Sequence, residues 1–213
     1  MRIPSNKVAD IFRFAHAELG ALYAEKEVES MMFLFCNEFL GWSKAITLSN
    51  REQNINQSDL LRFHHAIKAL KQGKPVQYII GSAFFYDSNF EVNEHTLIPR
   101  PETEELAALI INQNSTKAGM SVLDIGTGSG CIAVTLAKHL SEAKVIAIDV
   151  SVEALDVARK NAGAQNVDVD CQQEDIFYPT KTISGKKFDI IVSNPPYVCD
   201  SEKALMRDRK SVV

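Results

Sequence analysis

Apolar residues in the first 70 positions recur at intervals of three and four, which places them on one face of an α-helix. The pattern predicts three or four amphipathic helices joined by short loops, and such helices pack into a small bundle. Ser5 is placed to cap the first helix, Ser58 or Asp59 the last, and Gly41 to end the second. The expected helices cover residues 5–19, 25–40, 43–48 and 58–73.

The hydrophobic pattern changes after this bundle. Residues 76–80 form an apolar run that predicts a strand, and residues 84–92 predict two short aromatic strands around the turn Asp87-Ser88-Asn89. We interpret residues 74–100 as a β-hairpin connector between two domains. A helical domain then covers residues 1–73, and a second domain covers residues 101–213.

The second domain begins with a helix at Pro101, whose fixed φ suits a first helical turn. Apolar strands and helices then alternate, which predicts a mainly parallel, doubly wound sheet of the Rossmann-like kind. We therefore expect an α/β protein with a helical bundle at its N-terminus. The last strand is apolar at nearly every position, so we expect it to be buried on both faces. The expected strands cover residues 122–125, 144–148, 167–171 and 188–192.

A glycine-rich loop follows the first of these strands. Its spacing is G-x-G-x-G and differs from the G-x-G-x-x-G fingerprint of dinucleotide sites, so it supports pyrophosphate binding only weakly. Glycines let the backbone approach a ligand closely, and the N–H groups that start the next helix favour a carboxylate or a phosphate. The residues of this loop are Gly126, Thr127, Gly128, Ser129 and Gly130.

Acidic residues follow the next two strands. Asp149 is placed to accept both hydroxyls of an unphosphorylated ribose. Asp175 is placed to accept from an adenine amino group, with Ile176 covering the ring. Either carboxylate alone is more often a solvated strand end. Because the two lie at successive strand ends, we interpret them as a nucleoside site, and S-adenosylmethionine fits this site better than NAD.

The fourth strand runs into Asn194-Pro195-Pro196-Tyr197. The prolines end the strand in a stiff, extended turn. The Asn194 side-chain oxygen and the Pro195 carbonyl can accept the two hydrogens of a planar NH2 group, and Tyr197 can stack on its face. Such a turn can also be no more than a rigid strand exit. Asn-Pro-Pro-Tyr after an apolar strand resembles the signature of methyltransferases that act on the amino group of adenine or cytosine, or on the amide of glutamine.

Several motifs together resemble the HemK-type protein-(glutamine) methyltransferases, which modify peptide chain release factors. They are VLDIGTGSGCIAVTLA, the positions of Asp149 and Asp175, SNPPYV, and LIPRPETEEL behind an aromatic hairpin, and the match covers residues 5 to 206. The glycine loop and Asn-Pro-Pro-Tyr are shared with DNA methyltransferases, whereas IPRPETE is not.

The resemblance implies S-adenosylmethionine as cofactor and, as substrate, the glutamine of the Gly-Gly-Gln motif in class-1 release factors. It implies that the helical domain helps to bind that factor. Asn194, Pro195 and Tyr197 are the expected catalytic residues, and Asn194 also lies beside the cofactor. The expected substrate-binding residues are Arg100, Asn194, Pro195, Pro196 and Tyr197.

The family fold implied by the resemblance continues with three further strands of a seven-stranded sheet. Sixteen residues follow Tyr197 in this 213-residue chain. We therefore expect a C-terminally truncated or frame-disrupted product whose fourth strand is an uncovered edge. Such a chain would be less stable than the full-length enzyme, and weak or inactive. One alternative is a non-catalytic remnant that binds the cofactor or the release factor without turnover.

The amino-acid composition adds little to these predictions of fold and function. The formal net charge of −4 gives no general attraction to nucleic acid. This disfavours the other alternative, a nucleic-acid amino-methyltransferase, for which a basic cleft and a base-recognition domain are expected. The sequence shows no signal peptide and no apolar run long enough to span a membrane, so we expect a cytoplasmic protein. The cysteines and histidines lack metal-ligand spacing, and no metal is expected.

Overall fold

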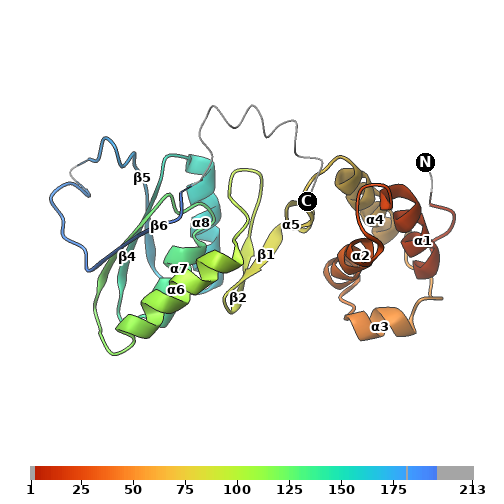
Figure 1. Ribbon diagram of the computed structural model, residues 1–213, viewed down its shortest axis with the longest axis horizontal. Coiled ribbons are helices and arrows are strands. Elements are labelled where there is room, and N and C mark those ends of the chain that lie inside the picture. Colours follow the sequence, from red (N-terminus) through yellow and green to blue (C-terminus); the bar gives the residue numbers. More distant parts are fainter. Residues whose placement is uncertain (1–2, 181, 196–213) are drawn as a thin grey trace. The chain divides into compact units, whose positions relative to one another are not determined.

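The computed structural model describes residues 3–180 and 182–195. The chain divides into two compact units, with the boundary between Ile80 and Gly81 (Figure 1). Each unit contains its own cluster of buried apolar side chains. None of the helices in these described ranges is long and apolar enough to cross a membrane.

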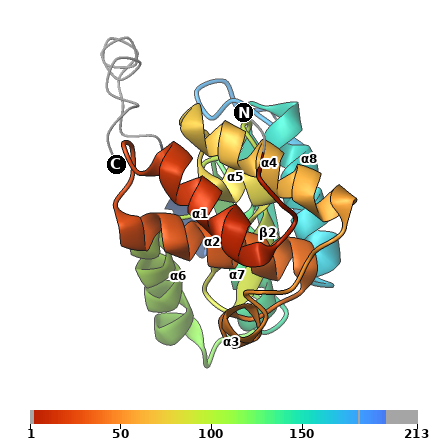
Figure 2. The same ribbon diagram turned by 90° about the vertical axis from the view of Figure 1, so that its right-hand side faces the viewer.

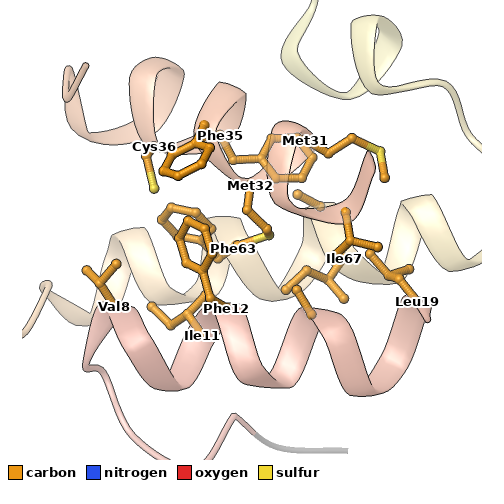
Figure 3. Packing of buried hydrophobic residues seen from close by; sticks show 14 of the residues in the cluster. Val8, Ile11, Phe12, Leu19, Met31, Met32, Phe35, Cys36, Phe63 and Ile67 are labelled. Carbon is orange, nitrogen blue, oxygen red and sulfur yellow. The ribbon is translucent and has the colours of Figure 1, made fainter. Parts of the chain in front are cut away.

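The first unit is a bundle of helices, in which α1, α2 and α4 pack against one another (Figure 2). Its helices are α1 (Val8–Leu19), α2 (Glu25–Leu40), α3 (Lys44–Ser49), α4 (Gln57–Lys71) and α5 (Val76–Ile80). Their apolar faces meet in a core of aliphatic, aromatic and sulfur-containing side chains (Figure 3). The ring of Phe63, which is buried in this core, meets the partly buried ring of Phe39 edge to face, with centroids 5.2 Å apart. The helical period of the sequence therefore predicted this bundle correctly.

Two of the predicted helix caps are wrong. Lys7 precedes α1 as its N-cap, while Ser5 hydrogen-bonds the side chain of Asp10. Asn56 caps α4, because its Oδ1 accepts from the backbone N–H of Asp59 at 2.8 Å. Before α4, Asn56, Ser58 and Asp59 are all of types that can cap a helix, so the sequence alone does not select among them. Lys7 makes no side-chain cap hydrogen bond at the start of α1. The C-cap at Gly41 is confirmed, with a left-handed φ of 68°.

Residues 76–80 form helix α5, so the predicted strand is wrong. The backbone N–H groups of Tyr78 and Ile79 donate to the Pro75 carbonyl at 3.1 and 3.2 Å. Proline has the φ of a first helical turn, which favours this arrangement. A mostly apolar segment of five residues is too short for its periodicity to separate a helix from a strand.

The second unit opens with an antiparallel hairpin of β1 (Ser82–Phe85) and β2 (Ser88–Glu91). Phe85 pairs with Ser88, so the turn consists of Tyr86 and Asp87 and lies earlier than the sequence predicted. Asp87 accepts from Lys138 at 3.1 Å, and this ion pair connects the turn to the end of α7.

The rest of this unit is a parallel sheet with the strand order β5-β4-β3-β6. Helix α7 packs on both α6 and α8 and on the sheet. This confirms the Rossmann-like alternation expected from the sequence. The elements are α6 (Pro101–Asn114), β3 (Ser121–Ile125), α7 (Cys131–His139), β4 (Lys144–Asp149), α8 (Val152–Ala164), β5 (Val169–Gln173) and β6 (Ile190–Ser193).

Strand β5 begins two residues later than predicted, because the turn after α8 uses the intervening residues. The N–H groups of Asn166 and Val167 donate to the carbonyls of Gly163 and Ala162, both at 3.1 Å. Asn166 has a left-handed φ of 55°. These features form a Schellman motif, which closes the helix before the strand can start.

Strand β6 lies at the edge of the described sheet, beside β3. Asp189 and Ser121 pair reciprocally at the start of the two strands. The Asp189 N–H donates to the Ser121 carbonyl at 2.9 Å, and its Oδ2 accepts from the Ser121 N–H at 2.8 Å and hydroxyl at 2.7 Å. Burial of β6 on both faces was predicted wrongly, since Val192 is buried while Ile191 is 61% exposed. The apolar content of a strand does not show whether both faces are covered.

Candidate active site

The glycine loop folds over the end of β4. The N–H groups of Gly126 and Thr127 both donate to the Ile148 carbonyl, at 2.8 and 3.0 Å. The three glycines all have left-handed φ values, of 69°, 56° and 77° for Gly126, Gly128 and Gly130. Glycine adopts these values without the steric cost that other residues meet. The loop therefore turns sharply enough to start α7 at Cys131.

The three glycines have different surroundings. A Cβ atom added to Gly126 would meet nothing within 4 Å, and one added to Gly128 would meet only the Leu97 nitrogen, at 4.0 Å. A Cβ atom on Gly130 would lie 2.9 Å from the Cβ of Ala158 in α8. The first two glycines thus leave open space for a ligand, whereas Gly130 allows a helix to pack closely. Sequence reasoning assigned all three to the ligand.

Asp149 joins the glycine loop to the start of α8. Its Oδ2 accepts from the Gly128 N–H at 2.9 Å, and its Oδ1 accepts from the Ser151 N–H at 3.0 Å. The Asp149 carbonyl accepts from the Glu174 N–H at 3.1 Å, which brings the end of β5 to the same edge. The structure therefore brings Asp149 and the loop together, as the motif spacing predicted.

Asp175 and Ile176 follow Glu174 at this edge. The Asp175 carboxylate accepts from the Phe177 N–H at 2.9 Å and so closes a local turn. Ile176 is 38% exposed, and the neighbouring Phe177 and Tyr178 are more than 80% exposed. The structure places Asp175 near Asp149 along the edge, although its described hydrogen bonds remain within its own turn.

Asn194 lies at the end of β6, and its side chain reaches the first turn of α6. Its Nδ2 donates to Oγ1 of Thr103 at 2.8 Å, and Thr103 is 5% exposed. The Ser193 hydroxyl donates to the Ile125 carbonyl at 2.8 Å, beside the start of the glycine loop. The structure thus joins two motifs that are 91 residues apart in sequence.

The other residues expected around Asn194 are only partly described. Pro195 is exposed, and Arg100 is the exposed N-cap of α6, whose carbonyl accepts from the Thr103 N–H at 3.0 Å. Pro196 and Tyr197 lie outside the described residues. Thr103 was missed by sequence reasoning, which treated the Pro-Glu-Thr-Glu segment only as a helix start. The sequence feature that could have indicated Thr103 is a small polar residue in the first helical turn, close to Pro99 and Pro101.

Asp124, at the end of β3, was also missed. It is 1% exposed, and its Oδ2 accepts from the Thr127 hydroxyl at 2.7 Å. Its Oδ1 has no hydrogen-bond partner among the residues that the structure describes. Burial raises the pKa of Asp124 to about 6, against the lowering effects of Thr127 and of the Ala133 backbone, and the charge of Asp149 adds to the increase. A buried carboxylate below the glycine loop favours a cationic ligand.

Asp124→Asn is expected to alter how stability depends on pH. The pKa of Asp124 is raised from its ordinary value of 3.8 to about 6, so the folded protein holds this proton more tightly than the unfolded chain does. The resulting stability is complete below about pH 4 and is lost as the pH rises through about 6. Asp124→Asn should therefore gain about 2–3 kcal/mol in free energy of unfolding, relative to the unaltered chain, between about pH 4 and pH 8.

Urea denaturation of both proteins across this pH range measures the difference. The comparison cancels the other carboxylates, including Asp87 and Asp189, whose pKa values are lowered by hydrogen bonds that oppose the effect of desolvation. A difference in unfolding free energy that is the same at every pH would show that Asp124 has no raised pKa.

Two family models match this chain. Residues 102–208 match the methyltransferase small domain, and residues 10–81 match the PrmC N-terminal domain. Among solved structures, a ribosomal protein L11 methylase from Lactobacillus delbrueckii subsp. bulgaricus is 27% identical. That match covers 57% of this chain and 60% of the other, with a TM-score of 0.41.

Curated relatives match most of the chain. A release factor glutamine methyltransferase from Flavobacterium psychrophilum is 44% identical over 87% of this chain and 65% of its own length. The protein of the same name from Bacteroides thetaiotaomicron is 40% identical over 92% of this chain and 69% of its own length. This chain thus spans about two thirds of these relatives. Together, these matches show that the chain belongs to the release factor glutamine methyltransferase family.

Proposed function

We propose that this protein transfers a methyl group from S-adenosylmethionine to the side-chain amide of glutamine in the Gly-Gly-Gln motif of class-1 release factors. Family membership supports the reaction, since the relatives are named release factor glutamine methyltransferases. The hydrogen bond between Asn194 and Thr103 carries the assignment of the site, because it fixes a side-chain amide at the edge that holds the glycine loop. We expect the helical unit to help bind the release factor.

Charge and open space at the carboxyl ends of the strands fit S-adenosylmethionine. Gly126 and Gly128 leave room above the loop, and Asp124 provides a buried carboxylate with an unpartnered oxygen among the described residues. S-adenosylmethionine carries two positive charges, an ammonium and a sulfonium, and supplies an electrophilic methyl carbon when bound. We assign Asp149 to the ribose hydroxyls and Asp175, with Ile176, to the adenine.

Asn194 and Pro195 are assigned to the substrate amide. A glutamine amide nitrogen is a weak nucleophile because its lone pair is delocalised into the carbonyl. If the Asn194 Oδ1 and the Pro195 carbonyl accept its two N–H groups, they raise the electron density on nitrogen and aim it at the methyl carbon. S-adenosylmethionine, if held at this edge, would supply the methyl group to this nitrogen, and the amide proton would leave after the transfer. Transfer then requires no general base beforehand.

Two measurements test this function. Calorimetry with S-adenosylmethionine should show binding at one site per chain. Transfer of a labelled methyl group should then occur to a release factor with an intact Gly-Gly-Gln motif. No label should reach the same factor with this glutamine changed to alanine, or reach DNA.

The outcomes separate the competing functions. Label on DNA would indicate a nucleic-acid amino-methyltransferase. Cofactor binding without label on any substrate would indicate a protein that binds but does not catalyse transfer. Absence of cofactor binding would contradict the proposed function itself.

A further inference from the structure

Asn161 in α8 is a buried polar residue with three hydrogen bonds. It is 3% exposed. Its Oδ1 accepts from the Glu91 N–H at 2.7 Å, and its Nδ2 donates to the Glu91 carbonyl at 3.0 Å. The same Nδ2 donates to the Ser129 carbonyl at 2.8 Å. One side chain therefore holds both backbone groups of a residue in β2 and one carbonyl of the glycine loop.

The peptide bond between Ser129 and Gly130 is held from several directions. Its carbonyl accepts from Asn161, and its N–H donates to the Thr127 carbonyl at 2.9 Å. On the side of α8, Ala158 leaves no room for a Cβ atom at Gly130. Ala158 and Asn161 are three residues apart, so they share one face of the helix. Helix α8 thus fixes this peptide both by packing and by a hydrogen bond.

We propose that Asn161 is a positioning residue for cofactor binding, which fixes the shape of the glycine loop before the ligand arrives. The proposal rests on the proposed function, in which this loop holds S-adenosylmethionine. A loop that is already ordered binds without paying the entropy of ordering on association. Without the Asn161 amide, the buried Ser129 carbonyl would lose this donor, and both backbone groups of Glu91 would lose their hydrogen bonds to it. The loop would then relax to find another donor for Ser129.

Helix α8 offers a matched control one turn further on. Gln165 Nε2 donates to the Asn89 carbonyl of β2 at 3.2 Å. Gln165, the C-cap of α8, therefore connects the end of the same helix to the same hairpin strand, but none of its hydrogen bonds within the described part of the chain reaches the glycine loop. If Asn161 acted only by holding the hairpin, variants at the two positions would affect cofactor binding in the same way.

The test compares Asn161→Leu with Gln165→Ala. Three quantities are measured for each protein: the dissociation constant for S-adenosylmethionine by calorimetry, the thermal unfolding midpoint, and amide hydrogen exchange in residues 126–133. Asn161→Leu should weaken cofactor binding at least tenfold and speed exchange in this segment. Gln165→Ala should change the affinity less than about twofold, even where the unfolding midpoint falls.

Affinity within twofold of the unaltered chain for folded Asn161→Leu would overturn the proposal. So would equal losses of affinity in the two variants. If Asn161→Leu does not fold, Asn161→Asp replaces it, because this nearly isosteric change keeps the acceptor for Glu91 and removes both donors. It should give the same loss of affinity.

Failure of the proposed function can be told apart from failure of the inference. An unaltered chain that does not bind S-adenosylmethionine contradicts the proposed function. Hydrogen exchange in residues 126–133 then still tests Asn161. Unchanged exchange in both of its variants would show that this side chain does not fix the loop.

Discussion

Replacement of Asn194 by alanine is expected to lower the rate of methyl transfer to a release factor by about 10²–10³-fold, the range found when one polar group that stabilises a transition state is removed. In the proposed mechanism this side chain accepts a hydrogen from the substrate amide, and alanine cannot. Affinity for S-adenosylmethionine should change by less than about tenfold, since the glycine loop and the carboxylates remain. Labelled methyl transfer under single-turnover conditions measures the first quantity, and calorimetry measures the second.

Thr103→Val is the matched variant for this experiment. It keeps Asn194 and nearly the same side-chain volume, but removes the oxygen that accepts from the Asn194 amide at 2.8 Å. We expect an intermediate loss of rate, of about tenfold, because the asparagine is present but less well oriented. Near-normal transfer by Asn194→Ala, with the cofactor bound, would refute the role assigned to this residue.

Gly130→Ala is expected to lower the free energy of unfolding by about 2–4 kcal/mol, through left-handed strain together with overpacking. The φ of Gly130 is 77°, and the new Cβ atom would lie 2.9 Å from the Cβ and 3.1 Å from the Cα of Ala158. The second contact is with helix backbone, which cannot rotate away. Urea denaturation of the variant and the unaltered chain measures the loss.

Gly126→Ala provides the control for backbone strain alone. Its φ is 69°, but its Cβ atom would meet nothing within 4 Å, so we expect a loss of about 1 kcal/mol. Ala158→Gly should restore part of the stability of Gly130→Ala, because it removes one of the two colliding atoms. Equal losses at Gly126 and Gly130 would mean that close packing of α8 does not explain the second glycine.

Features with a local cause could be predicted from the sequence. The helical faces of the bundle, the C-cap at Gly41 and the helix start at Pro101 all depend on residues within one or two turns. The alternation of strand and helix patterns along the chain likewise predicted the parallel sheet. The error at α5 has a local cause too, because a mostly apolar segment of five residues is too short to show a period.

The polar partnerships of the site could not be predicted in this way. Asn194 meets Thr103 across 91 residues, and Asn161 meets Glu91 across 70. Such pairs depend on how helices pack against the sheet, and the spacing of residues along the chain does not predict this packing. The burial of Asp124 is a similar case, since its sequence position resembles those of Asp149 and Asp175 at other strand ends, which are only half-buried.

The pairing of Asp189 with Ser121 also fixes the position of Asn194, although it lies at the opposite end of β6. This pairing fixes the register of β6 against β3, because a shift of β6 by one residue would break all the hydrogen bonds between Asp189 and Ser121. The same slide would carry Asn194 about 3.3 Å along the strand and turn its side chain to the other side of the sheet. The position of Asn194, which we assign to the substrate amide, is thus fixed by strand pairing five residues earlier.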